Sequence, residues 1–225
     1  MHQDSGDLTE IYLNGKAAGR IRCDPRLIPA PGQYLPAWAA EDLSAPLATP
    51  VFSAGSCPGG FFAAPPLPLE WQPGTHLQLR GPLGKGFQLP PGARFVALAA
   101  FDEASCSRLL ALLEPALAQR AAVVLLTDHP PEGLPAAVEI SPLSALAETL
   151  RWADMLALDM TRAVLPTVLG HIRDTSYSRE GQVLIHTPIP CAGMGECGAC
   201  AIRLRTGHRL ACKEGPVFDL KSFFE

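Results

Sequence analysis

The sequence predicts a three-part fold: an N-terminal antiparallel β-barrel, an α/β domain with a parallel sheet, and a small cysteine-rich C-terminal domain. Three observations lead to this prediction. Short strand-like segments broken by turns fill the first 90 residues, and buried strands alternate with helices from about residue 94. Four of the seven cysteines fall within the last 35 residues. The expected domains are therefore residues 1–92, 93–186 and 187–225.

The first domain has the pattern of a small barrel. Leu8–Leu13 and Ala17–Ile21 flank an Asn14-Gly15 turn, which is typical of a β-hairpin. Further strands are expected at Val51–Ala54 and Thr75–Arg80. Eleven prolines between residues 25 and 73 exclude long helices from this region.

The second domain changes to alternating strands and helices. Arg94–Ala100 and Ala121–Thr127 are continuous apolar segments, as expected for strands that are buried on both faces. Between them, apolar residues recur at helical spacing over Leu109–Leu117, and Asp102 is the expected N-cap. Further strands and helices are expected at 136–140, 144–152, 155–158, 162–172 and 183–186. This alternation predicts a parallel, doubly wound sheet.

Composition and charge exclude several classes of protein. Hydrophobic residues make up 48% of the chain, which is enough for a substantial core, so a long disordered protein is excluded. The net charge of −4 and the lack of basic runs argue against a nucleic-acid binder. No apolar run approaches the ~18 residues of a spanning helix, and Met1–Asp7 does not resemble a signal peptide. A cytoplasmic protein is expected.

The cysteines of the third domain are the strongest functional signal. Cys191, Cys197, Cys200 and Cys212 have the spacing C-x5-C-x2-C-x11-C. Such crowded thiolates need a cation, and three cysteines within ten residues are close to the plant-type [2Fe–2S] spacing C-x4-C-x2-C…C. The glycine-containing loop 192–196 allows backbone N–H groups to turn toward an anionic cluster. The extra residue in the first gap leaves zinc and free thiols open as alternatives.

Several motifs resemble one family. Thr187–Cys191, Glu196–Ala201 and Leu210–Asp219 look like the cluster domain of the electron-transfer subunit of dihydroorotate dehydrogenase. Gly81–Phe87 is similar to that family's hinge, and Pro31–Tyr34 to a barrel strand of the ferredoxin reductase-like superfamily. The resemblance implies an FAD-binding barrel, an NAD-binding α/β domain and a [2Fe–2S] domain. Electrons would pass from a flavin-containing catalytic subunit through the cluster and FAD to NAD+.

The flavin motif of that family is degenerate in this chain. The family's Arg-Pro-x-Ser segment corresponds to Thr49–Ser53, which has no arginine, and no Lys or Arg lies between Arg26 and Arg80. Ser53 is the one residue that aligns with a family flavin contact. The segment Gly59–Trp71 is too short for both a strand and a phosphate loop. A pyrophosphate needs cationic or N–H partners, so no tightly bound FAD is expected.

The nicotinamide motif is degenerate as well. Residues 93–132 contain no glycine, although the family has a glycine-rich loop after the first strand of this domain. Asp102 and Glu103 occupy the place of the phosphates, which their charge would repel. We therefore expect neither NAD nor NADP to bind.

The sequence predicts an iron–sulfur electron-transfer subunit that passes electrons to or from a flavin-containing, dihydroorotate dehydrogenase-like partner. The chain alone would then not be a complete enzyme, and a hetero-oligomer is expected. Arg203, Arg205, Arg209 and Lys213 are expected to surround the contact, with the loop 192–196 facing the partner's flavin. Two alternatives stay open: a complete FAD- and NAD-dependent oxidoreductase with unrecognised contacts, and a zinc-stabilised scaffold subunit without a redox role.

Overall fold

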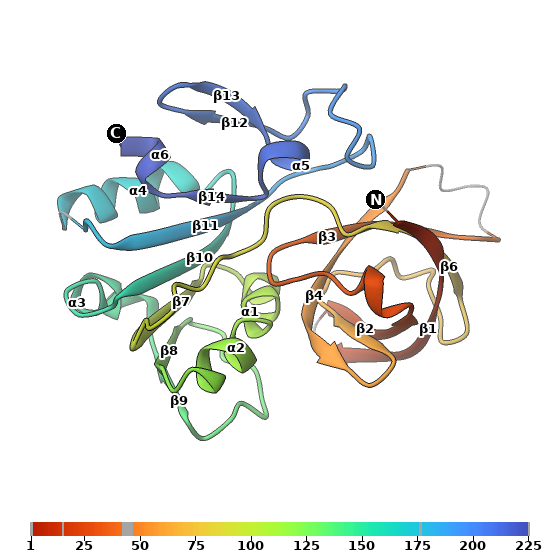
Figure 1. Ribbon diagram of the computed structural model, residues 1–225, viewed down its shortest axis with the longest axis horizontal. Coiled ribbons are helices and arrows are strands. Elements are labelled where there is room, and N and C mark those ends of the chain that lie inside the picture. Colours follow the sequence, from red (N-terminus) through yellow and green to blue (C-terminus); the bar gives the residue numbers. More distant parts are fainter. Residues whose placement is uncertain (1, 15, 42–46, 176, 225) are drawn as a thin grey trace.

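The computed structural model describes residues 2–14, 16–41, 47–175 and 177–224. A closed barrel lies beside a six-stranded sheet with helices packed against it, and the C-terminal segment lies above the junction between them (Figure 1). This segment is therefore in a position to contact both larger units.

The barrel contains six strands in the order β1-β2-β5-β4-β3-β6, and all neighbouring pairs are antiparallel. Its strands are β1 (His2–Asn14), β2 (Lys16–Cys23), β3 (Tyr34–Ala39), β4 (Thr49–Cys57), β5 (Gly60–Ala63) and β6 (His76–Gly81). The predicted hairpin is confirmed, because β1 pairs with β2 and places Leu8 opposite Ile21. The turn residue Gly15 lies outside the described residues. A short 3-10 helix, η1 (Pro25–Leu27), follows β2.

The sequence analysis did not predict β5, which completes the barrel between β2 and β4. A Cβ atom at Gly60 would lie 1.9 Å from the carbonyl oxygen of Ile21, so this close approach of two strands requires glycine. The four-residue strand has a glycine at one end and prolines soon after the other, which made it look like a loop.

The sheet has the order β14-β11-β10-β7-β8-β9. Its strands are β7 (Phe95–Ala100), β8 (Ala122–Leu126), β9 (Val138–Ser141), β10 (Met155–Thr161), β11 (Glu180–His186) and β14 (Val217–Asp219). Five strands are parallel as predicted, whereas β14 runs antiparallel to β11. The C-terminal segment thus adds an edge strand to the sheet, and it buries Val217 and Phe218 there.

The helices follow the strands, with one correction. Asp102 caps α1 (Glu103–Leu110) as predicted, because its carboxylate accepts the N–H of Ser105 at 2.8 Å. A single helix through Leu117 is wrong, since the chain breaks before α2 (Leu113–Ala118). Pro115 lacks an N–H, and its ring would collide with the carbonyl four residues earlier in a continuous helix. The remaining helical segments are η2 (Leu143–Ala145), α3 (Leu146–Thr149), α4 (Leu165–Asp174), α5 (Ala211–Glu214) and α6 (Lys221–Phe224).

None of the described helices is long and apolar enough to cross a membrane.

Candidate metal centre

A short hairpin and helix bring Cys200 and Cys212 together. Cys200 directly precedes β12 (Ala201–Leu204), which pairs with β13 (Gly207–Leu210) and leads into α5 (Ala211–Glu214). The N–H of Ala211 donates to the carbonyl oxygen of Cys200 at 3.0 Å. The N–H of Cys212 points at the Sγ atom of Cys200 at 3.5 Å. Both cysteines are buried, so the hairpin fixes one half of the predicted ligand set.

The other two cysteines flank a loop whose backbone turns inward. Ala192 has a φ of 50°, and Gly193, Gly195 and Gly198 have φ values of 79°, 83° and 70°. Left-handed residues of this kind turn successive N–H groups toward a common point and form an anion-binding concavity. A Cβ atom at Gly195 would lie 2.8 Å from Lys213 Cε. The loop therefore depends on its glycines for this shape.

The N–H groups that point into this concavity change the pKa of the Cys191 thiol. Cys191 is half-buried. Burial raises the pKa of this thiol. Hydrogen bonds from the N–H groups of Gly195 and Glu196, together with the thiol and N–H of Cys197, outweigh burial and lower the pKa to about 6. Because metals bind the thiolate, this environment prepares Cys191 as a ligand.

Pairwise contacts connect Cys212 with Cys200 and Cys191, and Cys191 with Cys197. Burial raises the pKa of Cys212 to about 12, and the nearby Cys200 and Cys191 thiols add to the effect. Cys191 is in turn close to Cys197, which is exposed. Among the residues that the structure describes, no group of three or more His, Cys, Asp or Glu side chains is arranged to hold a metal ion.

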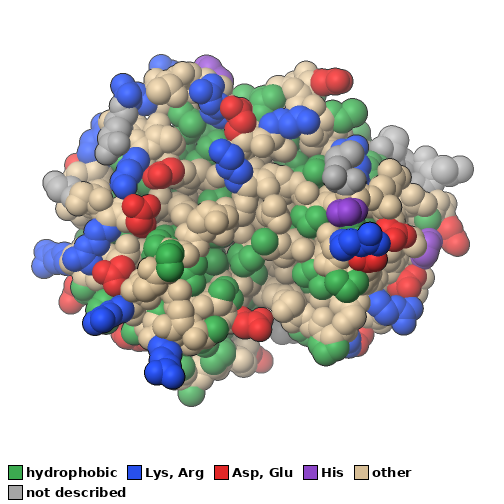
Figure 2. Space-filling model, in the orientation of Figure 1, with side chains coloured by type: hydrophobic (Ala, Val, Ile, Leu, Met, Phe, Trp, Pro, Cys, Tyr) green, Lys and Arg blue, Asp and Glu red, His purple; other side chains and the backbone are tan. Residues whose placement is uncertain are grey.

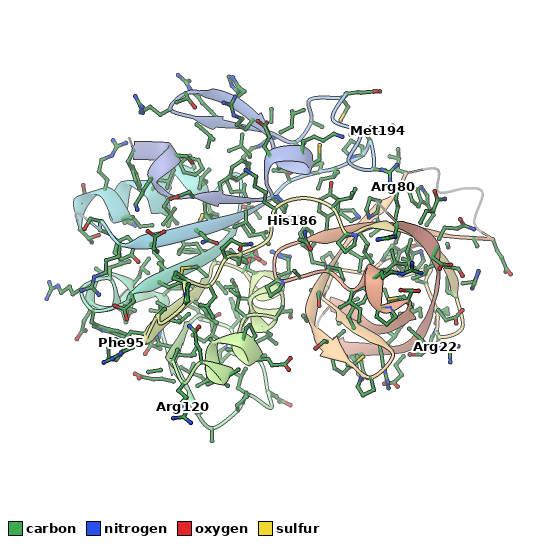
Figure 3. All side chains as sticks on the ribbon, viewed as in Figure 1. Arg22, Arg80, Phe95, Arg120, His186 and Met194 are labelled. Carbon is green, nitrogen blue, oxygen red and sulfur yellow. The ribbon has the colours of Figure 1, made fainter. Side chains whose placement is uncertain are left out.

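Two barrel residues contact the loop 192–196 and the adjacent Cys212, and we call this loop the cysteine loop. The buried Tyr34 hydroxyl donates to the carbonyl oxygen of Cys212 at 3.1 Å, and a Cβ atom at Gly193 would lie 2.7 Å from that hydroxyl. Arg80 Nη2 donates to the carbonyl oxygen of Ala192. Figure 3 shows Arg80 at the edge of the barrel, near the loop that carries the exposed Met194. Sequence reasoning did not assign Tyr34 and Arg80 to the site, because both are more than 110 positions away from the loop in the chain.

Three of the four basic side chains predicted to surround the partner contact are exposed. Arg203, Arg205 and Lys213 are exposed, whereas Arg209 is half-buried and its Nε atom contacts the carboxylate of Glu214 at 3.1 Å. Figure 2 shows Lys and Arg side chains gathered along the upper edge of this face, where Figure 1 places β12 and β13. This edge therefore carries exposed basic side chains, together with the exposed carboxylates of Glu196 and Glu214.

A cavity of about 540 Å³ lies where the barrel meets the carboxyl ends of β10 and β11. Phe52 from β4 forms part of its wall, and its ring centroid lies 5.8 Å from that of Tyr34 and 6.2 Å from that of His186. Ser53, the predicted flavin contact, is buried next to Phe52, and its Oγ atom accepts the N–H of Gly55 at 3.1 Å.

The cationic side chains of this cavity already have protein partners. The Nε and Nη2 atoms of the buried Arg108 each donate to Asp159 at 2.8 Å. Burial lowers the pKa of Arg108, but the Asp159 carboxylate raises it by more. Arg162 Nη1 lies 3.3 Å from the carbonyl oxygens of Ala199 and Ala201. The cavity wall is otherwise mainly apolar, so it suits a flat ring better than a pyrophosphate.

The start of α1 is also occupied by this chain's own groups. It follows β7, where the strand order reverses between β10 and β8, the usual place for a nucleotide in such sheets. There the Asp102 carboxylate takes the N–H of Ser105. A phosphate at this helix end would face a carboxylate instead of free N–H donors.

Comparisons with known structures define the class of fold. A chain of an NADH-dependent reduced ferredoxin-NADP oxidoreductase, described for flavin-based electron bifurcation, aligns with a TM-score of 0.76 at 13% identity, over 96% of this chain and 88% of that one. The ferredoxin reductase of carbazole 1,9a-dioxygenase aligns with a TM-score of 0.61 at 16% identity, over 79% of this chain and 66% of that one. The ferredoxin-NADP+ reductase of Plasmodium falciparum aligns with a TM-score of 0.55 at 10% identity, over 75% and 89%. The chain has the ferredoxin reductase-like fold.

The family comparison concerns the cysteine region. Residues 190–223 match the model of the iron-sulfur cluster binding domain of dihydroorotate dehydrogenase B. No curated protein sequence matches the chain. The C-terminal segment is thus an iron–sulfur binding domain on a ferredoxin reductase-like fold, and both findings support the resemblance to the electron-transfer subunit of dihydroorotate dehydrogenase.

Proposed function

We propose that this chain is a [2Fe–2S] electron-transfer subunit that exchanges electrons with a flavin-containing, dihydroorotate dehydrogenase-like partner. The observation that carries the proposal is the concavity of N–H groups around Cys191, next to the hairpin that joins Cys200 and Cys212. Backbone donors of this kind favour a negatively charged group. When bound, the cluster would supply one-electron transfer and no substrate chemistry.

The ligands that we propose are Cys191, Cys197, Cys200 and Cys212. The pairwise contacts of Cys191 with Cys197 and of Cys212 with Cys200 and Cys191 support this assignment, and so does the match to an iron–sulfur binding domain. The two-iron type is supported by the spacing of the first three cysteines. Zinc is the weaker alternative, since N–H groups directed at the sulfur atoms compensate an anionic cluster.

We propose that tightly bound FAD is not part of this chain. The cavity near Ser53 offers Phe52 and prolines to a flat ring. Its guanidinium groups, from Arg108 and Arg162, are engaged with Asp159 and with backbone carbonyls. A pyrophosphate would therefore have to compete for its cationic partners. The carboxylate cap of α1 supports the same conclusion for NAD and NADP.

A partner protein is then needed to hold the flavin. The loop 192–196 places Met194 at the surface, where 53% of the residue is exposed, and the exposed Lys213 lies against Gly195 of the same loop. Such a surface suits close contact with an acidic flavoprotein. The free cysteines are consistent with a reducing compartment, so we propose that the complex is cytoplasmic.

Anaerobic co-purification from the native host tests this proposal. We expect a flavoprotein to accompany the chain, and we expect the flavin to stay with the partner when the two are separated at high salt. Equimolar FAD on the isolated chain would instead favour a complete oxidoreductase. A monomer without a flavoprotein would favour a free, ferredoxin-like carrier.

A further inference from the structure

Arg80 connects the barrel to the cysteine loop and has one hydrogen-bond donor without a partner among the described residues. It lies near the end of β6, and its Nη2 atom donates to the carbonyl oxygen of Ala192, the residue after Cys191. Its Nε atom is buried and has no hydrogen-bond partner among the described residues. A buried donor without a partner is costly, and native structures rarely leave one in this state.

The surroundings of Arg80 point to the missing acceptor. Its charge acts on Tyr34, and the hydroxyl of Tyr34 donates to the carbonyl oxygen of Cys212. Burial raises the pKa of the Tyr34 hydroxyl, and the charges of the Cys191, Cys200 and Cys212 thiolates also act on Tyr34 and raise this pKa. Arg80 and the three thiols thus all lie within electrostatic reach of Tyr34, and Arg80 is hydrogen-bonded to the residue that follows Cys191, at the barrel side of the loop (Figure 3).

We propose that Arg80 is a positioning residue that donates its Nε–H to a sulfur of the bound cluster and raises its reduction potential. This inference rests on the proposed function. A guanidinium cannot lose its proton in proteins, so its charge is constant over the working pH range. Reduction adds one negative charge to the cluster, and a fixed cation with a hydrogen-bond donor stabilises that state. The barrel, which lacks the family's flavin-binding arginine, would thus still contribute to electron transfer.

Two variants separate charge from hydrogen bonding. Arg80→Met removes both, whereas Arg80→Lys keeps a positive charge without the planar fork. Arg22→Met is the matched control, because Arg22 is an exposed arginine of the same barrel that pairs with Asp7. Figure 3 shows Arg22 at the far side of the barrel from the loop.

The test is a redox titration followed by electron paramagnetic resonance, after iron and acid-labile sulfide have been measured. At a fixed potential we expect Arg80→Met to lower the ratio of reduced to oxidised cluster about tenfold, which equals about 59 mV for one electron. Arg80→Lys should lower this ratio less than Arg80→Met does, and Arg22→Met should have the same ratio as the wild type.

Hyperfine spectroscopy of the reduced wild type should in addition detect an exchangeable proton that disappears in Arg80→Lys. Potentials of both Arg80 variants within twofold of the wild type would overturn the inference and leave the proposed function intact. If Arg80→Met assembles no cluster, an unchanged potential and proton signal in Arg80→Lys would overturn it equally. A wild type without labile sulfide would overturn both proposals.

Discussion

The cysteine loop and the start of α1 are two anion-binding positions of the same fold, and they differ in what faces the anion. In the loop, N–H groups of Gly195 and Glu196 point at Cys191 and lower the pKa of its thiol. At α1, the side chain of Asp102 takes the N–H that a phosphate would need. The comparison shows that the loop directs N–H donors at a thiol, whereas the start of α1 presents a carboxylate, so the two positions favour groups of opposite charge.

The largest effect is expected from the cysteines. Cys200→Ser should abolish the cluster, because Cys200 receives the N–H of Cys212 and lies at the base of the hairpin. The edge strand β14 belongs to the same segment, so its protection from hydrogen exchange should fall as well. Iron and sulfide analysis with hydrogen exchange measures both. Cys57→Ser, in the barrel, is the control and should keep the cluster; equal iron content in the two variants would contradict the assignment.

The next effect concerns the buried ion pair between Arg108, in the wall of the cavity near Ser53, and Asp159. Arg108→Met should destabilise the chain by about 3–5 kcal/mol, because it leaves the fully buried Asp159 carboxylate without its partner. Urea unfolding measures this loss. The double variant Arg108→Met/Asp159→Leu should recover most of the stability. A loss below 1 kcal/mol in the single variant would mean that this pair does not stabilise the fold.

A smaller effect is expected at the basic surface. Arg203→Ser and Arg205→Ser should each weaken association with the flavoprotein by about 0.2–1 kcal/mol, since both side chains are exposed and screened by salt. Binding measured at low and at high salt should show the loss mainly at low salt. Salt-independent association in the wild type would exclude these residues from the contact.

The smallest effect is expected from nicotinamide nucleotides. Calorimetric titration with NADH or NADPH should show no binding below millimolar concentration, because the N-terminus of α1 presents the Asp102 carboxylate. A dissociation constant in the micromolar range would show that the phosphates bind elsewhere on the α/β domain.

Much of this arrangement could be predicted from local patterns. Buried apolar segments identified the five parallel strands, and Asp102 was recognisable as the cap of α1. Local patterns could not show that β14 joins the sheet, because a three-residue strand has no periodicity of its own. Pro115 is a sequence signal for the break between α1 and α2. The apolar residues on both sides of it keep helical spacing, so the pattern alone predicts one continuous helix.

The candidate site was likewise only partly predictable from the sequence. The cysteine spacing identified candidate ligands, but the support from Tyr34 and Arg80 depends on contacts across the whole chain. The pairing of Arg108 with Asp159 has the same origin, since 51 positions separate the two residues. No local signal marks such a pair before the sheet is assembled.

The visible spectrum and metal content of anaerobically purified protein test the central claim most directly. We predict two irons and two acid-labile sulfides per chain, held by Cys191, Cys197, Cys200 and Cys212, with a rhombic paramagnetic signal after reduction. One zinc per chain without labile sulfide would contradict the account, because the cysteine region would then be a structural site without a redox role.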